Sequence, residues 1–127
     1  MAALNSERLM ALPRASISAT AHDKTQRFEG SDLRDVLRAA GVESTENLRG
    51  GALRRVVSVH AADGYVVAFA LAELDSSIGD RRVLLVNRQD GAALAADQGP
   101  WRLVVPSDRR SARWVRQVTR IVVADGT

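Results

Sequence analysis

The feature that most constrains the fold is a series of short strand-like runs separated by sequences typical of tight turns. Residues 53–71 read LRRVVSVHAADGYVVAFAL, in which Asp63–Gly64 lies between two apolar runs. Residues 81–91 read RRVLLVNRQDG, in which an apolar strand is followed by a turn at Asp90–Gly91. An Asp-Gly pair between apolar runs is a strong signal for a β-hairpin. Repeated hairpins argue against the regular strand–helix alternation of a doubly wound fold.

Other segments predict further strands. Residues 14–22, RASISATAH, alternate as a strand, and residues 23–30, DKTQRFEG, read as its return, with a turn at His22–Asp23–Lys24. Two more expected strands are WRLVVP at 101–106, which Pro106 ends, and VTRIVVAD at 118–125. Between these two, residues 107–117 read as a loop or a single helical turn.

The clearest helix is SDLRDVLRAAG at residues 31–41. Ser31 is the expected N-cap, and Gly41 is the expected residue just past the helix end. The apolar residues recur at helical spacing and predict one buried stripe, made of Leu33, Val36, Leu37 and Ala40. The sequence therefore predicts an α+β fold with a mixed or antiparallel β-sheet, hairpins and one main helix.

Length and composition place the chain among small folded domains. Its 127 residues predict a single domain over residues 1–127, and 46% hydrophobic residues are enough for a core. There is no cysteine, which excludes disulfides and thiolate metal ligands from this chain. His22 and His60 are far apart and match no metal-binding spacing, so no protein metal site is expected. No apolar run is long enough to span a membrane, and no signal peptide is expected in the residues given.

Positive charge is concentrated near the C-terminus. The net charge is +3, but residues 99–127 hold six arginines and two aspartates, a net of +4. The two tryptophans, Trp101 and Trp114, lie in the same segment. Guanidinium groups stay charged and bind oxyanions with two parallel hydrogen bonds. The alternative interpretation is a solvated basic face with tryptophans that only anchor the core.

The order of motifs from residue 28 to residue 123 resembles a known family. Residues 28–42, FEGSDLRDVLRAAGV, place a glycine before a short helix that ends in Ala-Gly-Val, and DGYVVAFALAEL follows as a strand and turn. The C-terminal part supplies an ordered set of matching positions: Gly91, Leu94, Gly99, Pro100, Arg102, Leu103, Pro106, Arg113, Arg116 and Ile121. This set resembles the molybdopterin-binding domain of the sulfite oxidase family.

The resemblance implies a sulfite-oxidase-like fold with a pocket for molybdopterin, a pterin dithiolene cofactor that carries a phosphate. By residue-to-residue match, Arg113 and Arg116 would help to hold the cofactor, with Arg102 on the adjoining strand. If residues 113–116 form a helical turn, the first two guanidinium groups share one face. Trp114, like Trp101, could wall the site or stack on a flat ring.

The family's redox enzymes bind molybdenum through a cysteine that precedes the segment matched by FEGSDLRDVL. Here that region reads RASISATAHDKTQR and holds none. We therefore expect weak, altered or vestigial cofactor binding, because the missing thiolate argues against ordinary molybdenum redox catalysis. Whether the domain is an enzyme stays open at this point.

Other functions are also considered. A non-catalytic module on the same fold would bind a small anion or a protein partner. Nucleic-acid binding is suggested by a pI of about 10.5, but acidic residues are interleaved with basic ones and no reading motif is present, so it ranks low. From the resemblance alone, a periplasmic location is expected if a signal peptide has been removed.

Overall fold

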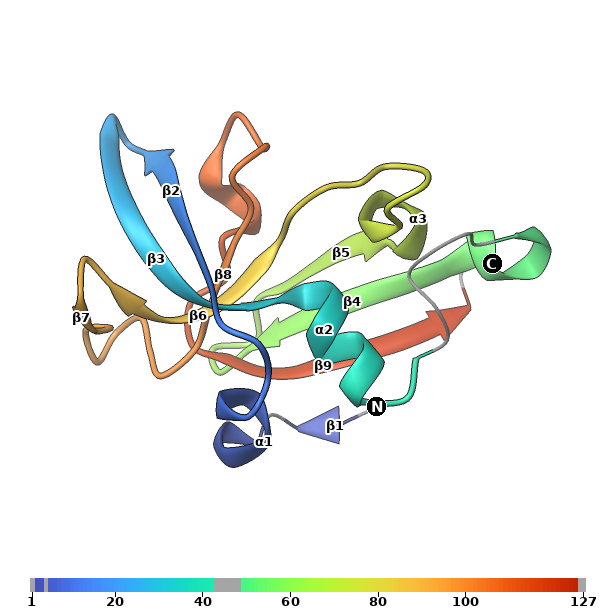
Figure 1. Cartoon of the computed structure of the whole chain (residues 1–127), viewed down its shortest axis with the longest axis horizontal. Coiled ribbons are helices and arrows are strands. Elements are labelled where there is room, and N and C mark those ends of the chain that lie inside the picture. Colours follow the sequence, from blue (N-terminus) through green and yellow to red (C-terminus); the bar gives the residue numbers. More distant parts are fainter. Residues whose placement is uncertain (1, 4, 43–48, 126–127) are drawn as a thin grey trace.

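A computed structural model describes residues 2–3, 5–42 and 49–125 of the chain. Among these residues, the strands form two antiparallel sheets with short helices at their ends and edges (Figure 1). This arrangement confirms the expected α+β class with hairpins and few helices.

The first sheet has the strand order β1-β9-β4-β5 in the described residues. Its strands are β1 (Ala2–Ala3), β4 (Arg55–Ala61), β5 (Val66–Ala70) and β9 (Val118–Asp125). The predicted hairpin joins β4 to β5, and Gly64 in its turn has a φ of 90°, a conformation that glycine adopts without strain. β5 is left at one edge of this sheet.

The second sheet is built around β6. Its strands are β2 (Ala15–Ala21), β3 (Lys24–Asp32), β6 (Leu84–Gln89), β7 (Ala92–Ala93) and β8 (Arg102–Val104). β6 pairs with β3 on one side and with β7 and β8 on the other. The predicted turn between β2 and β3 is confirmed, with positive φ angles at His22 and Asp23.

The helical segments of the described chain are short. They are α1 (Ser6–Met10), α2 (Leu33–Ala39), α3 (Leu71–Leu74) and the 3₁₀ turns η1 (Gly50–Arg54) and η2 (Ser111–Arg113). The predicted main helix is α2, but the expectation that Ser31 caps it was wrong. Asp32 is the N-cap, and its carboxylate accepts the Arg34 N–H at 2.9 Å. Ser31 still belongs to β3, where it pairs with Leu85 of β6.

One core joins the two sheets. A single buried cluster contains Val59 and Phe69 of the first sheet together with Phe28 and Leu85 of the second. The backbone between β8 and β9 also connects the sheets. The Leu103 N–H donates to Val115 O at 2.8 Å, and the Val118 N–H donates to Trp101 O at 2.9 Å. The arginine-rich segment 109–116 is therefore anchored at its C-terminal end against β8.

Candidate binding site

A cavity of about 420 Å³ lies where the β4–β5 turn meets the arginine-rich segment. Its lining consists of Ala61, Asp63, Tyr65, Asp97, Ser111, Ala112, Trp114, Arg116 and Gln117. The hairpin turn, the loop before β8 and the segment from η2 to β9 all contribute to this wall. Two of the four predicted site residues, Trp114 and Arg116, are in the lining.

Arg102 lies directly against the same tryptophan. Its guanidinium carbon is 5.5 Å from the centre of the Trp114 ring and 5.9 Å from that of Phe28. The two rings pack edge to face, with centroids 5.7 Å apart. Such a position over aromatic faces favours a cation electrostatically. Trp114 is itself fixed, because its Nε1–H donates to Val105 O at 2.9 Å.

The polar contacts of Arg102 are incomplete. Its Nη1 donates to Gln98 Oε1 at 2.9 Å, but its Nε is buried and has no hydrogen-bond partner. Burial lowers the pKa of Arg102, and the positive charge of Arg116 lowers it further, while Asp97 acts in the opposite direction. Two like charges therefore lie close together beside the cavity. An anion bound there would relieve their repulsion and satisfy the buried donor.

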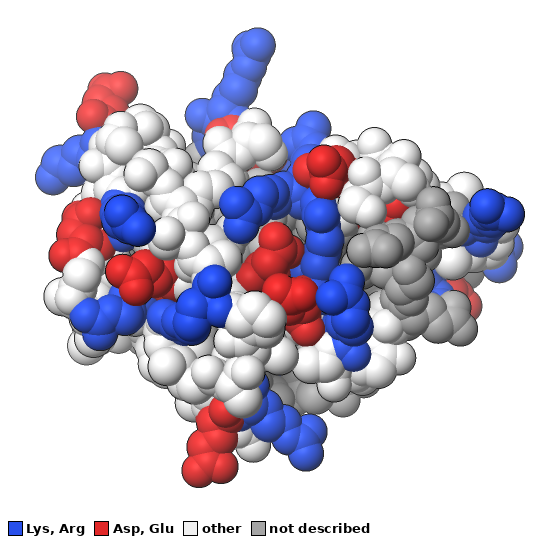
Figure 2. All heavy atoms as spheres, viewed as in Figure 1, with Lys and Arg blue, Asp and Glu red and all other residues white. Residues whose placement is uncertain are grey.

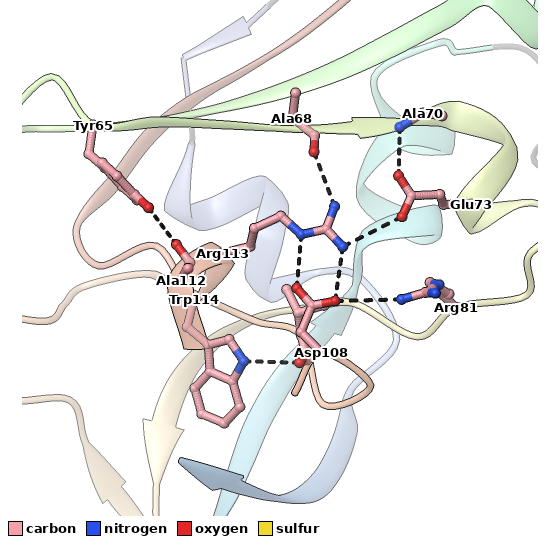
Figure 3. Close-up of polar contacts among 10 residues, drawn as sticks. Tyr65, Ala68, Ala70, Glu73, Arg81, Asp108, Ala112, Arg113 and Trp114 are labelled. Carbon is pink, nitrogen blue, oxygen red and sulfur yellow. Dashed lines mark hydrogen bonds and ion pairs between the residues drawn. The ribbon is translucent and has the colours of Figure 1, made fainter. Parts of the chain in front are cut away.

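Arg113, the fourth predicted residue, is engaged elsewhere (Figure 3). Its Nε and Nη2 donate to the two carboxylate oxygens of Asp108 at 2.8 and 2.9 Å. Nη1 donates to Ala68 O at 3.1 Å, and Glu73 lies 3.5 Å from Nη2. The hydrogen bond with Asp108 raises the pKa of Arg113. This guanidinium thus has protein partners on every nitrogen.

The structure accordingly brings Arg102, Trp114 and Arg116 together and holds Arg113 in a separate cluster. The expected helical face shared by Arg113 and Arg116 does not form, because η2 ends at Arg113. Trp101 is a core residue, 3% exposed, and its Nε1–H donates to Ser6 Oγ at 3.1 Å.

Sequence reasoning missed the acidic and hydroxyl side of the cavity. Asp63 was interpreted as a turn residue, and it does accept the Tyr65 N–H at 2.9 Å. The same residue also lines the cavity, as Asp97 does. The only signal available was that Asp63 lies in a hairpin turn, and a turn does not reveal which distant segment packs beside it.

Comparison with known families decides what this site belongs to. The sequence matches the family described as oxidoreductase molybdopterin binding domain over residues 4–127. The chain belongs to this family. No curated protein matches the chain.

The donor set of this molybdopterin-binding domain fits the organic part of the cofactor. Arg102 and Arg116 suit a phosphate, Trp114 suits a flat ring, and the carboxylates of Asp63 and Asp97 suit N–H donors. The set does not fit a metal bound by the protein, since the chain has no cysteine. Within the described parts of the chain, no group of three or more His, Asp or Glu side chains could hold a metal ion. No helix in those parts is long and apolar enough to cross a membrane.

Proposed function

We propose that this chain is a sulfite-oxidase-like domain that binds a flat, anionic ligand of the pterin phosphate class without supplying a protein ligand to molybdenum. The observation that supports it best is the position of Arg102. A partly buried guanidinium lies against Trp114, with a buried Nε that has no partner and a second arginine, Arg116, close by. A buried donor without a partner costs free energy, which a ligand acceptor would recover.

In this proposal each wall of the cavity has one task. Arg102 and Arg116 bind the anionic group, and Trp114 contacts the face of the ring. Asp63 and Asp97 accept hydrogen bonds from amino or ring N–H groups, which a simple inorganic anion lacks. Molybdopterin, when bound, supplies its own dithiolene sulfurs to a metal. The chain contributes binding and orientation, and we derive no redox step from it.

The direct test is the content of protein purified from a host that makes the cofactor. We expect the fluorescence of oxidised pterin in the wild type, and its loss in Arg116→Ala. Arg110→Ala is the matched control, because Arg110 is an exposed arginine of the same segment that does not line the cavity. Molybdenum measured by mass spectrometry then reports whether a metal accompanies the pterin.

A thermal-shift titration separates the two candidate ligand classes. A ligand at about 100 times its Kd stabilises the folded state by about 2.7 kcal/mol, which corresponds to a rise in Tm of roughly 10 °C for a domain of this size. A shift with a pterin phosphate that Arg116→Ala abolishes supports the proposal. An equal shift with inorganic phosphate alone favours the small-anion module. No shift with either, and no pterin in the purified protein, rejects both.

A further inference from the structure

The edge of β5 is a surface that could pair with another strand. β5 is the outermost strand of its sheet in the described residues. Residues 65–71, YVVAFAL, contain no charge, proline or glycine. An apolar, β-prone and uncharged segment on a sheet edge is the usual starting point for strand pairing between molecules. Tyr65 and Val66 are about half exposed, at 49% and 47%.

Side chains of the same molecule occupy this edge. Arg113 Nη1 donates to the backbone oxygen of Ala68 at 3.1 Å, and Glu73 accepts the backbone N–H of Ala70 at 2.9 Å. At the other end of the strand, the Tyr65 hydroxyl donates to Ala112 O at 2.6 Å. Figure 3 shows the three contacts along one side of β5. They use backbone groups that a pairing strand would need.

The two charged residues at the edge are also held in place. Arg113 forms the paired hydrogen bonds with Asp108 and lies 3.5 Å from Glu73, and its guanidinium carbon is 4.2 Å from the centre of the Phe69 ring. Arg81 approaches Asp108 from the loop after α3 at 3.5 Å. Such a network loses less side-chain freedom per contact than an isolated surface pair, so it can persist at a partly exposed site.

We propose that Glu73, Asp108 and Arg113 act as an edge guard that prevents β5 from pairing with β5 of a second copy of this chain. The second copy is the occupant that the strand itself favours. An antiparallel pair of identical, uncharged strands around a two-fold axis meets no charge conflict, and Ala68 and Ala70 present only methyl groups. The same guard explains why the guanidinium of Arg113 is directed to the sheet edge instead of the cavity.

The test is the association state of guard variants, measured by sedimentation velocity over a range of protein concentrations. We expect the wild type to remain a monomer and Arg113→Ala to move towards twice the chain mass as concentration rises. Should Arg113→Ala fail to fold, Glu73→Ala opens the Ala70 N–H from the other side of the guard. Circular dichroism confirms that each variant tested is folded.

A second substitution separates edge pairing from general stickiness. Val66→Lys places a charge on β5 itself, so Arg113→Ala/Val66→Lys should return to a monomer. Arg113→Ala/Ile78→Lys is the matched control, because Ile78 is 52% exposed but lies outside β5. The proposal is overturned if folded Arg113→Ala and Glu73→Ala stay monomeric, or if Ile78→Lys restores the monomer as well as Val66→Lys does. It is equally overturned if the wild type associates and Val66→Lys alone abolishes that association.

Discussion

Arg102 places a permanent charge against two aromatic rings with only part of its hydrogen-bonding capacity used. Burial lowers its pKa, which means that the protein environment disfavours the charged form relative to water. A residue that costs stability in the ligand-free fold is understandable if it gains partners when a ligand binds. Stability and binding should therefore respond in opposite directions when this charge is removed.

Arg102→Met keeps an unbranched side chain between Phe28 and Trp114 but removes the charge. We expect the free energy of unfolding of the ligand-free protein to stay unchanged or to rise by up to about 1 kcal/mol, because replacing a poorly paired buried charge with an apolar group is often neutral or stabilising. Urea unfolding followed by circular dichroism measures this. Arg116→Met, at an exposed position, is the control with no expected change. A loss above about 1 kcal/mol in Arg102→Met would contradict this interpretation.

The pair of Arg113 and Asp108 should behave in the opposite way. Asp108→Asn removes the charge that accepts both guanidinium hydrogen bonds, at 2.8 and 2.9 Å. We expect a loss of about 1.5–3 kcal/mol in the free energy of unfolding, the range for hydrogen bonds to charged groups. Asp125→Asn is the control, since Asp125 is largely exposed and lies 3.8 Å from Arg55. There the loss should be below about 0.5 kcal/mol. Equal losses in both variants would show that the bidentate pair adds nothing special.

At the scale of elements, the contact between β3 and β6 depends on Gly30. A Cβ at this position would meet the backbone oxygen of Leu85 and lie 2.5 Å from Val86 Cα, so the two strands would have to separate. Gly30→Ala should cost about 1–3 kcal/mol of unfolding free energy, towards the upper end because both atoms belong to the backbone. Gly51→Ala in η1 is the control, with only the flexible end of Arg54 nearby at 3.6 Å. Thermal unfolding of the two variants side by side decides the matter.

Local patterns predicted the elements better than their contacts. The turns at Asp63–Gly64 and Asp90–Gly91 were confirmed, and so was the helix over residues 33–39, since hairpin turns and apolar stripes are encoded by neighbours in sequence. The N-cap was wrong by one residue. Ser31 stays in β3 because its strand partner, Leu85, lies more than fifty positions away. Helix α1 was missed, because its five residues offer little periodicity.

The site shows the same division. That arginines and a tryptophan from residues 99–127 would lie together could be predicted, and Arg102, Trp114 and Arg116 do so. The environment of Arg113 could not be predicted, because Glu73 and Ala68 come from a hairpin forty residues earlier. Three nearby arginines look equivalent in sequence, and only tertiary packing shows which of them already has partners.

At the scale of the whole molecule, two sheets that share one core should unfold together. The buried cluster includes residues of both sheets, and the contacts of Leu103 and Val118 tie β8 to β9. We expect thermal unfolding in one transition, with the near-ultraviolet and far-ultraviolet circular dichroism signals changing at the same temperature. A near-ultraviolet signal that is lost first would mean that the sheets separate before they unfold.

Charge is distributed in a mixed pattern over the face seen in Figure 2, where acidic and basic side chains lie beside one another. Ion pairs such as Arg34–Asp80 at 2.8 Å account for part of this mixing. We therefore expect no retention on double-stranded DNA at physiological salt, in spite of the basic pI. Retention that falls steeply as salt is raised would contradict this and revive nucleic-acid binding as a function.

The packing of the indoles has a practical consequence. Trp101 is buried beside Ser6, whereas Trp114 forms part of the cavity wall with a guanidinium 5.5 Å away. A Trp101→Phe protein would hold a single indole emitter, located where any occupant must displace water or shift Arg102. Its emission intensity would then act as a built-in optical probe. Compound libraries could be screened against the unmodified fold without a dye, a label or any prior guess about the natural ligand.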